Sequence, residues 1–321
     1  MDISVLIITH NSETQIDSCL DSLARYTHVD HEVIIVDNAS IDATLEAATS
    51  FYQVHVIENT ENSGFAIAVN QAAQSAAGRY LLLLNPDTVV HEDTVDRLTA
   101  FMDSHPTVGI CAPRVLDTAG RIRHNCFAFE TPWSFFWFGV GVGPLVRVRN
   151  WMLCRSTWDI AADVPQVVEA VTGAAMLVRQ EIFEALGGLD ERFFMYCEDG
   201  DFCLRAQQAG WQTMLVPSAV ITHIGGTSAP QDAPMLNGMI GRYLLQSRFS
   251  YTHKYWGRCA AWLLRWAYAV AGALLWLTGH LFPSTGAGGK LKAHGRLLWR
   301  TPLPSIALIT QVDKVANIEE S

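Results

Sequence analysis

The N-terminal part of the chain alternates short apolar runs with segments that have the spacing of amphipathic helices. The apolar runs are Ser4–Thr9, Glu32–Val36, Val54–Glu58 and Tyr80–Leu84, and the clearest helical segments are Glu13–Tyr26 and Gly64–Ala77. Short runs rich in Val, Ile and Leu are typical of strands buried on both faces of a sheet. Strands that alternate with helices predict an α/β fold, with a mostly parallel sheet and helices on both of its faces.

Polar side chains follow these strands at the points where they end. They are Thr9-His10-Asn11, Asp37-Asn38, Glu58-Asn59 and Asn85-Pro86-Asp87. Open α/β sheets bind ligands outside the carboxyl ends of their strands, so this edge is expected to bind a nucleotide. The first strand is not followed by G-x-G-x-x-G, and the chain contains no G-x-x-x-x-G-K-[ST] loop. A divalent metal on Asp87 is therefore the candidate phosphate holder, and a plain turn at this position is the alternative.

An acidic cluster follows an aromatic run within Gly187–Asp201. The aromatic residues are Phe193, Phe194 and Tyr196, and the acids are Glu198, Asp199 and Asp201. The acids are expected in the first turn of a helix that ends before Gly210, where free backbone N–H groups stabilise negative charge. One reading is a helix cap with Asp201 paired to Arg205. The other is a working carboxylate, which the helix N-terminus would keep ionised.

The charge and the cysteine content of the chain limit the kinds of partner and the cellular setting that we expect. The net charge of -10 argues against nucleic acid as a partner. The segment 233–312 nevertheless contains nine Lys and Arg residues and no Asp or Glu, so a basic part follows an acidic one. The seven cysteines form no C-x-x-C pair, which suggests reduced thiols and a cytosolic setting. The first residues have no basic region with a cleavage site, so no secretory signal peptide is expected.

The middle of the chain has weaker patterns. Residues 111–165 contain several prolines and are predicted to be irregular, and their aromatic, glycine-rich part Phe135–Gly143 suits a mobile flap, a membrane-facing loop or core. Strand-like order resumes in Val167–Arg179, Thr213–Val216 and Ala219–Thr227. His223, which stands before Gly225-Gly226, is a candidate metal or phosphate ligand.

The C-terminal third is apolar and basic. Within Cys259–Phe282 the uncharged part begins at Trp266 and is short for a bilayer span, and we expect Thr278-Gly279-His280 to break it. Flanking Arg and Lys with abundant Trp and Tyr favour an interfacial helix or a re-entrant hairpin on an anionic leaflet. A buried bundle helix or a dimer interface is the alternative.

Taken together, these segments resemble a family, the inverting family 2 glycosyltransferases with the GT-A fold, and within it the rhamnosyltransferase-like branch that builds bacterial cell-surface polysaccharides. The matching segments, in chain order, are Val5–Ser12, Ile35–Asp42, Asn62–Asn70, Leu83–Asp87, Thr172–Ala175, Gly188–Phe194, Glu198–Asp201 and His223–Thr227. Each is weak alone, but the ordered set is highly specific and covers about two-thirds of the chain.

The resemblance implies roles for individual residues. The nucleotide-sugar donor would be bound by Thr9, Asn11, Asp37, Asn62, Gly64, Asn70, Asn85 and Asp87. Asp87 matches the last acid of the family's D-x-D motif and would hold Mg²⁺ or Mn²⁺ with His223. The first acid of that motif is replaced here by Asn85, which suggests weaker metal dependence. Asp199 would be the general base with Glu198 beside it, and the acceptor side would include Thr172, Gly173, Phe194 and Tyr196.

The implied function is inverting transfer of a sugar, with dTDP-rhamnose as the expected donor, to a lipid-linked or polysaccharide acceptor. A UDP- or GDP-hexose donor, a sugar-nucleotide nucleotidyltransferase, and an inactive membrane-bound glycan-binding scaffold remain alternatives. The catalytic domain is expected over 1–232, with a nucleotide-binding half to about 110 and an acceptor half over 111–232. Residues 233–321 are expected to place the protein on the cytoplasmic face of the plasma membrane, with a homodimer through this region as a further possibility.

Overall fold

The computed structural model describes residues 1–51, 54–139, 159–225, 238–281 and 286–302. The chain forms two compact units. Unit 1 comprises residues 1–129, 156–191 and 198–226, and unit 2 comprises residues 130–155, 192–197 and 227–321. The domain boundary expected near residue 232 lies outside the described residues.

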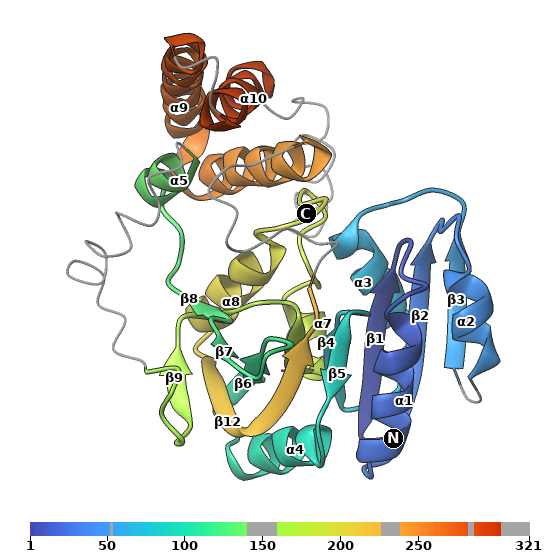
Figure 1. The fold of residues 1–321 in the computed structure, drawn as a ribbon. Coiled ribbons are helices and arrows are strands. Elements are labelled where there is room, and N and C mark those ends of the chain that lie inside the picture. The colour runs from blue at the N-terminus through green and yellow to red at the C-terminus, as the bar shows by residue number, and fades with distance from the viewer. Residues whose placement is uncertain (52–53, 140–158, 226–237, 282–285, 303–321) are drawn as a thin grey trace, which may run out of the picture. The chain divides into compact units, whose positions relative to one another are not determined.

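The first half of unit 1 has the alternating order predicted from the sequence (Figure 1). The elements are β1 Ile3–Thr9, α1 Ile16–Tyr26, β2 His31–Asn38, α2 Thr44–Ser50, β3 Val54–Asn59, α3 Phe65–Gln74 and β4 Tyr80–Leu84. These strands pair in parallel in the order β3-β2-β1-β4, with Thr9 opposite Asp37 at the carboxyl ends of β1 and β2. The parallel sheet expected for this half is therefore present, and its binding of a nucleotide stays a prediction.

The second half of unit 1 makes the sheet mixed. Its elements are β5 Thr88–Val90, α4 Thr94–Ser104, β6 Val108–Leu116, β7 Ile122–Arg123, β8 Cys126–Phe127, β9 Gln166–Val168, β10 Ala170–Val171, β11 Ala175–Arg179, α7 Gln180–Ala185, α8 Glu198–Gln208 and β12 Gln212–His223. The main sheet has the order β3-β2-β1-β4-β11-β6-β12-β5, and β11 is antiparallel to both β4 and β6.

Two sequence predictions for this half are wrong. Residues 111–165 are not irregular at their start, because β6 continues to Leu116 through its pairing with β12. The two short strands expected over 213–216 and 219–227 are one strand, β12, with a register shift between Val216 and Val220. Both differences arise from pairing between segments distant in sequence, which local patterns do not report.

The core has two layers, one on each face of the sheet. Alternate residues of β1 point to opposite layers: Ile3, Val5 and Ile7 join one cluster, and Leu6 and Ile8 join the other. The apolar face of α1 packs in the first cluster and that of α3 in the second. Burial on both faces explains why these strands are continuous apolar runs. Their parallel pairing brings their polar carboxyl ends to one edge of the sheet.

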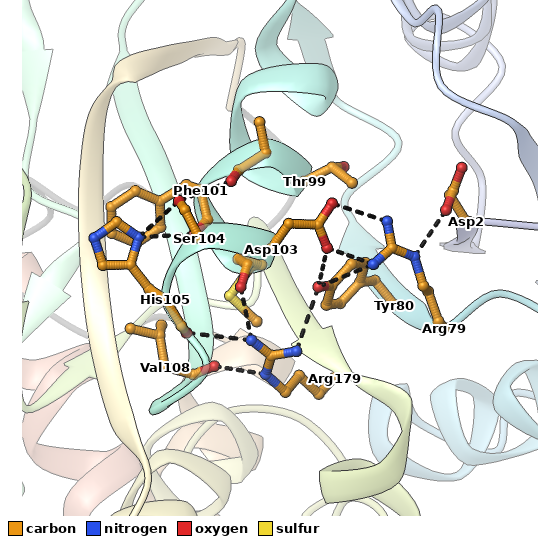
Figure 2. Close-up of polar contacts among 12 residues, drawn as sticks. Asp2, Arg79, Tyr80, Thr99, Phe101, Asp103, Ser104, His105, Val108 and Arg179 are labelled. Carbon is orange, nitrogen blue, oxygen red and sulfur yellow. Dashed lines mark hydrogen bonds and ion pairs between the residues drawn. The ribbon is translucent and has the colours of Figure 1, made fainter.

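A network of ion pairs and hydrogen bonds lies at the amino end of β4 (Figure 2). Arg79 pairs with Asp103 and with Asp2, and the Tyr80 hydroxyl donates to Asp103 at 2.8 Å. Arg179 donates from Nη1 to the Tyr80 hydroxyl at 3.3 Å. The Arg79 guanidinium holds the pKa of Asp103 below its usual value. Because these charges satisfy one another at the amino end of β4, we assign the network to stability.

Unit 2 combines helices with the non-helical residues 192–197 in its described part. It contains α5 Pro132–Gly139, α9 Gly238–Leu281 and α10 Gly286–Arg300. The predicted break at Thr278–His280 is wrong, because α9 continues to Leu281, and its non-helical residue is Gly257 (φ 78°, ψ 176°). Residues 140–143 of the glycine-rich segment and Phe282 lie outside the described residues. Phe135 is buried, so the start of that segment is core rather than flap.

The two long helices of unit 2 pack closely where glycines face each other. A Cβ on Gly272 would lie 2.7 Å from the Gly295 carbonyl oxygen, and a Cβ on Gly295 would lie 2.5 Å from that of Gly272. Small residues that allow such backbone contact are common where membrane helices pack. By length and composition, Gly241–Leu281 is apolar enough to cross a membrane, and only 22% of its most apolar window is buried.

Candidate active site of unit 1

The ends of β1 and β2 bring Thr9 and Asp37 together. The Thr9 hydroxyl donates to Asp37 Oδ1 at 2.8 Å, and both residues are buried. Ser40 donates to the same carboxylate from its backbone N–H at 2.9 Å and from its hydroxyl at 2.6 Å. A carboxylate has about four acceptor positions, so Asp37 retains capacity for one more donor. The contact with a nucleotide base remains a prediction for this pair.

Three other predicted donor residues shape the loops beside this edge. Asn11 has a left-handed backbone (φ 54°), and its Oδ1 accepts from the Ile41 N–H at 2.9 Å. Asn62 Oδ1 accepts from the Gly64 N–H at 3.0 Å, and Gly64 (φ 90°) caps α3. Asn38 Nδ2 donates to the Gly64 carbonyl at 3.2 Å. The start of α3 is therefore tied to the end of β2.

The Asn70 side chain bonds to residues that follow Gly188, and not to the loops beside β1 and β2. Its amide donates to the Leu189 carbonyl and accepts from the Leu189 N–H, both at 2.8 Å. It also donates to Glu191 at 3.0 Å. These bonds hold the segment that follows Gly188 against α3. A role in the donor pocket remains a prediction for Asn70, and the contacts that the structure shows are those of a structural clamp.

Asp87, directly before β5, meets His223 at the end of β12, the strand that pairs with β5. His223 Nε2 lies 3.1 Å from Asp87 Oδ1, and the Ile224 N–H donates to the Asp87 carbonyl at 2.8 Å. The Asp87 side chain is 5% exposed, and among the described residues its Oδ2 has no hydrogen-bond partner. A buried carboxylate oxygen without a partner is costly. A cation at Oδ2 would remove that cost.

Asp199 lies in the first turn of α8. Its Oδ2 accepts from the Gly173 N–H at 3.2 Å, and its Oδ1 accepts from the Gly200 N–H at 2.7 Å. Backbone N–H groups on both oxygens suit an ionised carboxylate. The predicted Asp201–Arg205 ion pair is confirmed at 2.8 Å, and Arg205 also donates to two carbonyls before the helix. Asp201 is therefore structural, and Asp199 is oriented toward the turn between β10 and β11.

That turn links the metal-capable pair to the acidic helix. The Asn85 N–H donates to the Ala174 carbonyl at 3.0 Å, next to the Gly173 N–H that contacts Asp199. A Cβ on Gly173 would lie 3.6 Å from the Phe65 ring at the start of α3. The backbone at 173–174 therefore touches the segment carrying Asp87, the start of α3 and the acidic helix. An acidic group and a buried metal-capable pair share one edge of unit 1.

The family follows from comparison of the chain with known proteins. The glycosyl transferase family 2 profile matches residues 4–125, and the glycosyl transferase family group 2 profile matches residues 80–289. The second match covers more than half of the chain. The chain is a family 2 glycosyltransferase. Its rhamnosyltransferase-like character, read from the ordered motifs, is also confirmed.

Individual relatives agree with this assignment. The glycosyltransferase is 27% identical over 246 residues to the N-acetylglucosaminyl-diphospho-decaprenol L-rhamnosyltransferase of Mycobacterium tuberculosis, covering 71% of this chain and 78% of the relative. GalNAc-T7 with UDP, GalNAc and Mn²⁺ matches at a TM-score of 0.57 and 18% identity, over 80% of this chain and 48% of that one. The mannosyltransferase PcManGT of Pyrobaculum calidifontis, with GDP-Man and Mn²⁺, matches at 0.52 and 18% identity, over 96% and 86%. The expected GT-A fold is confirmed.

Glu198 differs from Asp199 in its surroundings. It is 6% exposed, and its Oε2 has no hydrogen-bond partner within the part of the chain that the structure describes. Burial, reinforced by the neighbouring charge of Asp199, holds the pKa of the Glu198 carboxyl well above its usual range. A raised pKa favours the protonated form of this carboxyl group, whereas a general base has to be ionised. Of the two predicted catalytic acids, Asp199 has the geometry suited to that role.

The residues predicted for the acceptor side are divided between the units of the glycosyltransferase. Thr172 and Gly173 form the turn of unit 1, where the Thr172 N–H donates to the Asn125 carbonyl at 2.9 Å. Phe194 and Tyr196 belong to unit 2, and the Phe194 ring stacks on Tyr243 with centroids 4.4 Å apart. Sequence reasoning missed the contacts of α9 with this aromatic run, although helical spacing of its aromatic residues was available as a signal.

Proposed function

We propose that this glycosyltransferase transfers L-rhamnose from a dTDP-linked donor to a lipid-linked or polysaccharide acceptor, with inversion at the anomeric carbon. The named activity of the mycobacterial relative supports the sugar and the lipid-linked acceptor. One observation carries the mechanism: the turn at 173–174 contacts both Asp199 and the segment that leads to Asp87. An inverting transfer needs a base near the acceptor hydroxyl and positive charge near the leaving diphosphate, and both would be held at this edge.

In the proposed reaction, the acceptor hydroxyl oxygen attacks the anomeric carbon as the bond from that carbon to the diphosphate oxygen breaks. The hydroxyl proton passes to the Asp199 carboxylate. The Gly173 and Gly200 N–H groups hold that carboxylate in position. A positioned general base contributes typically ~10²–10⁴-fold.

The donor set at Asp87 fits a hard divalent cation. Mg²⁺ or Mn²⁺ would be held by Asp87 Oδ2 and by His223, with donor phosphate oxygens and water completing the coordination. When bound, the cation would stabilise negative charge on the leaving diphosphate. Among the described residues, no group of three His, Cys, Asp or Glu side chains is placed to hold a metal. With Asn85 in place of an acid, the protein supplies few charged ligands, which agrees with the weaker metal dependence suggested by the sequence.

The proposed function is tested by offering the purified full-length protein dTDP-rhamnose, UDP-hexoses and GDP-hexoses, with and without Mn²⁺, and a polyprenyl-diphosphate-linked sugar as acceptor. We expect nucleoside diphosphate release from dTDP-rhamnose to rise when acceptor is added. The new glycosidic bond should have the inverted anomeric configuration by NMR. Faster transfer from a UDP- or GDP-hexose would reassign the donor, and no release from any donor would contradict the proposal.

An exposed apolar stripe on unit 2 supports the proposal of a lipid-linked acceptor. The C-terminal half of α9 exposes one apolar stripe, made of Leu263, Trp266, Val270, Leu274, Leu277 and Leu281. Their spacing of three or four residues places them on one helix face. Beside this half of α9, α10 exposes Lys290, Arg296 and Arg300. A span would bring these charges into hydrocarbon, so the hairpin would lie in the interface of an anionic leaflet.

Polar substitution of this stripe should weaken membrane binding. Replacing Leu274 and Leu277, which are 58% and 55% exposed, with Asn in the full-length protein removes apolar surface that would enter the bilayer. Burying one Leu side chain is worth about 1.5–3 kcal/mol, so we expect at least about a tenfold fall in partition into phosphatidylglycerol-containing vesicles. Val164→Asn, at an exposed apolar residue of unit 1, is the matched control. Unchanged partition, with a dimer dissociated by the double substitution, would assign the stripe to self-association.

A further inference from the structure

A six-residue segment connects the two units immediately before the acidic helix. Residues Arg192–Cys197, here called the strap, cluster with unit 2, whereas Glu191 before them and Glu198 after them belong to unit 1. The strap therefore leaves unit 1 and returns to it at the first residue of α8, which Asp199 follows directly. The position at which the strap is held thus sets where the chain enters the catalytic helix.

One face of α9 holds the strap. The Tyr243 ring stacks on Phe194 at 4.4 Å, and the Ser247 hydroxyl donates to the Met195 carbonyl at 2.8 Å. Further along the helix, Tyr251 packs against the Phe193 ring, which is 1% exposed. Lys254 Nζ lies 6.0 Å from the centroid of that same ring. The four α9 residues are spaced four, four and three apart, so they lie on one helix face.

The last two residues of the strap have a left-handed backbone conformation. Tyr196 and Cys197 have φ values of 73° and 71°, and neither is glycine. This conformation is strained in a residue other than glycine and persists only where the surrounding structure determines it. The stack on Phe194 and the bond to Met195 precede these two residues directly, so α9 supplies contacts that can hold them. This strained pair leads straight into Glu198 and Asp199.

We propose that the face formed by Tyr243, Ser247, Tyr251 and Lys254 is a positioning surface for transfer, which acts by holding the strap and so setting the start of α8. The proposal rests on the proposed function of Asp199 as general base. Loosening the strap would displace the base relative to the acceptor hydroxyl, and small displacements of a reacting group cost large factors in rate. Donor binding, assigned to residues of the β1–β4 half, would be unaffected. The α9 residues would thus alter kcat and leave the donor KM unchanged.

The proposal is tested with Ser247→Ala and Tyr243→Ala in the full-length protein, with Tyr243→Phe as the conservative variant that keeps the ring stack. One hydrogen bond or one aromatic pair typically corresponds to about threefold to tenfold, so kcat should fall by that factor in each Ala variant and recover in Tyr243→Phe. The donor KM should change by less than about twofold. Arg242→Gln, at an exposed residue that is neither three nor four positions from any of these four, should leave kcat unchanged.

Hydrogen exchange separates this proposal from the proposed function. Backbone amides of the strap should exchange faster in both Ala variants, whereas those of β1 and β4 should exchange as in the wild type. Equal strap protection in variants and wild type would overturn the positioning surface, whatever the activity. Unchanged kcat despite a loosened strap, or a donor KM that rises in step with the loss of kcat, would overturn it as well. A wild-type protein that turns over no donor would instead reject the proposed function.

Discussion

Replacing Asp199 with Asn should abolish transfer while leaving donor binding intact. The Asn amide keeps one oxygen that can receive a hydrogen bond from the Gly173 or Gly200 N–H. It cannot take up the proton that the attacking sugar hydroxyl loses. We expect kcat to fall by ~10²–10⁴-fold, the usual contribution of a positioned general base. The measurement pairs initial transfer rates with donor affinity from calorimetry. Near-normal transfer by a folded Asp199→Asn protein would remove Asp199 from the mechanism.

Glu198→Gln is the matched control one residue away. Because the folded-state pKa of Glu198 is raised above its ordinary value of 4.5, the folded protein keeps a proton that the unfolded chain releases. The free energy of unfolding contributed by this group therefore decreases as pH rises above the unfolded pKa, until the folded group also ionises. The Gln variant lacks this decrease, so its advantage in thermal stability should grow with pH. Its transfer rate should stay within about threefold of wild type, because the raised pKa of the buried Glu198 carboxyl favours its neutral form, which Gln resembles. A loss equal to that of Asp199→Asn would make Glu198 the base.

Replacing Asp87 with Asn should abolish metal binding at the edge of unit 1. The substitution keeps the shape of the side chain and an acceptor for His223, but it removes the charge on the buried carboxylate. Metal stabilisation of a leaving oxygen is worth several kcal/mol, so we expect transfer at fixed Mn²⁺ to fall by at least about 100-fold. Mn²⁺ binding in the presence of nucleoside diphosphate, followed by electron paramagnetic resonance, gives a readout independent of turnover.

Two further variants serve as comparisons for the Mn²⁺ binding and the transfer rate of Asp87→Asn. His223→Gln removes the imidazole and keeps the Asp87 carboxylate, so we expect weaker Mn²⁺ binding by about 10–100-fold and a smaller loss of rate. Asp163→Asn, at a carboxylate whose side chain is 88% exposed, should change neither measurement. If Asp87→Asn bound Mn²⁺ as the wild type does, the candidate metal site would be wrong.

Local patterns in the sequence account for much of the first half of unit 1. Strands β1 and β4 match their predicted runs within one residue, because burial on both faces demands continuous apolar residues there. The acidic first turn of α8 and its Asp201–Arg205 pair were also readable, since caps and i,i+4 pairs are local. The antiparallel insertion of β11 and the extent of β6 were not, because they depend on pairing partners far along the chain.

The sequence by itself determined the family, the parallel first half of the sheet and the residue types at the candidate site, because ordered motifs and alternating apolar runs are properties of the sequence itself. Only the tertiary structure distinguishes the surroundings of Asp199 and Glu198, on which the proposed choice of base depends: one carboxylate receives backbone N–H groups, and the other is buried with an unpartnered oxygen among the described residues. It alone also showed that α9 holds the strap before Asp199. Burial, orientation and contact across more than 40 residues of sequence exist only once the chain has folded.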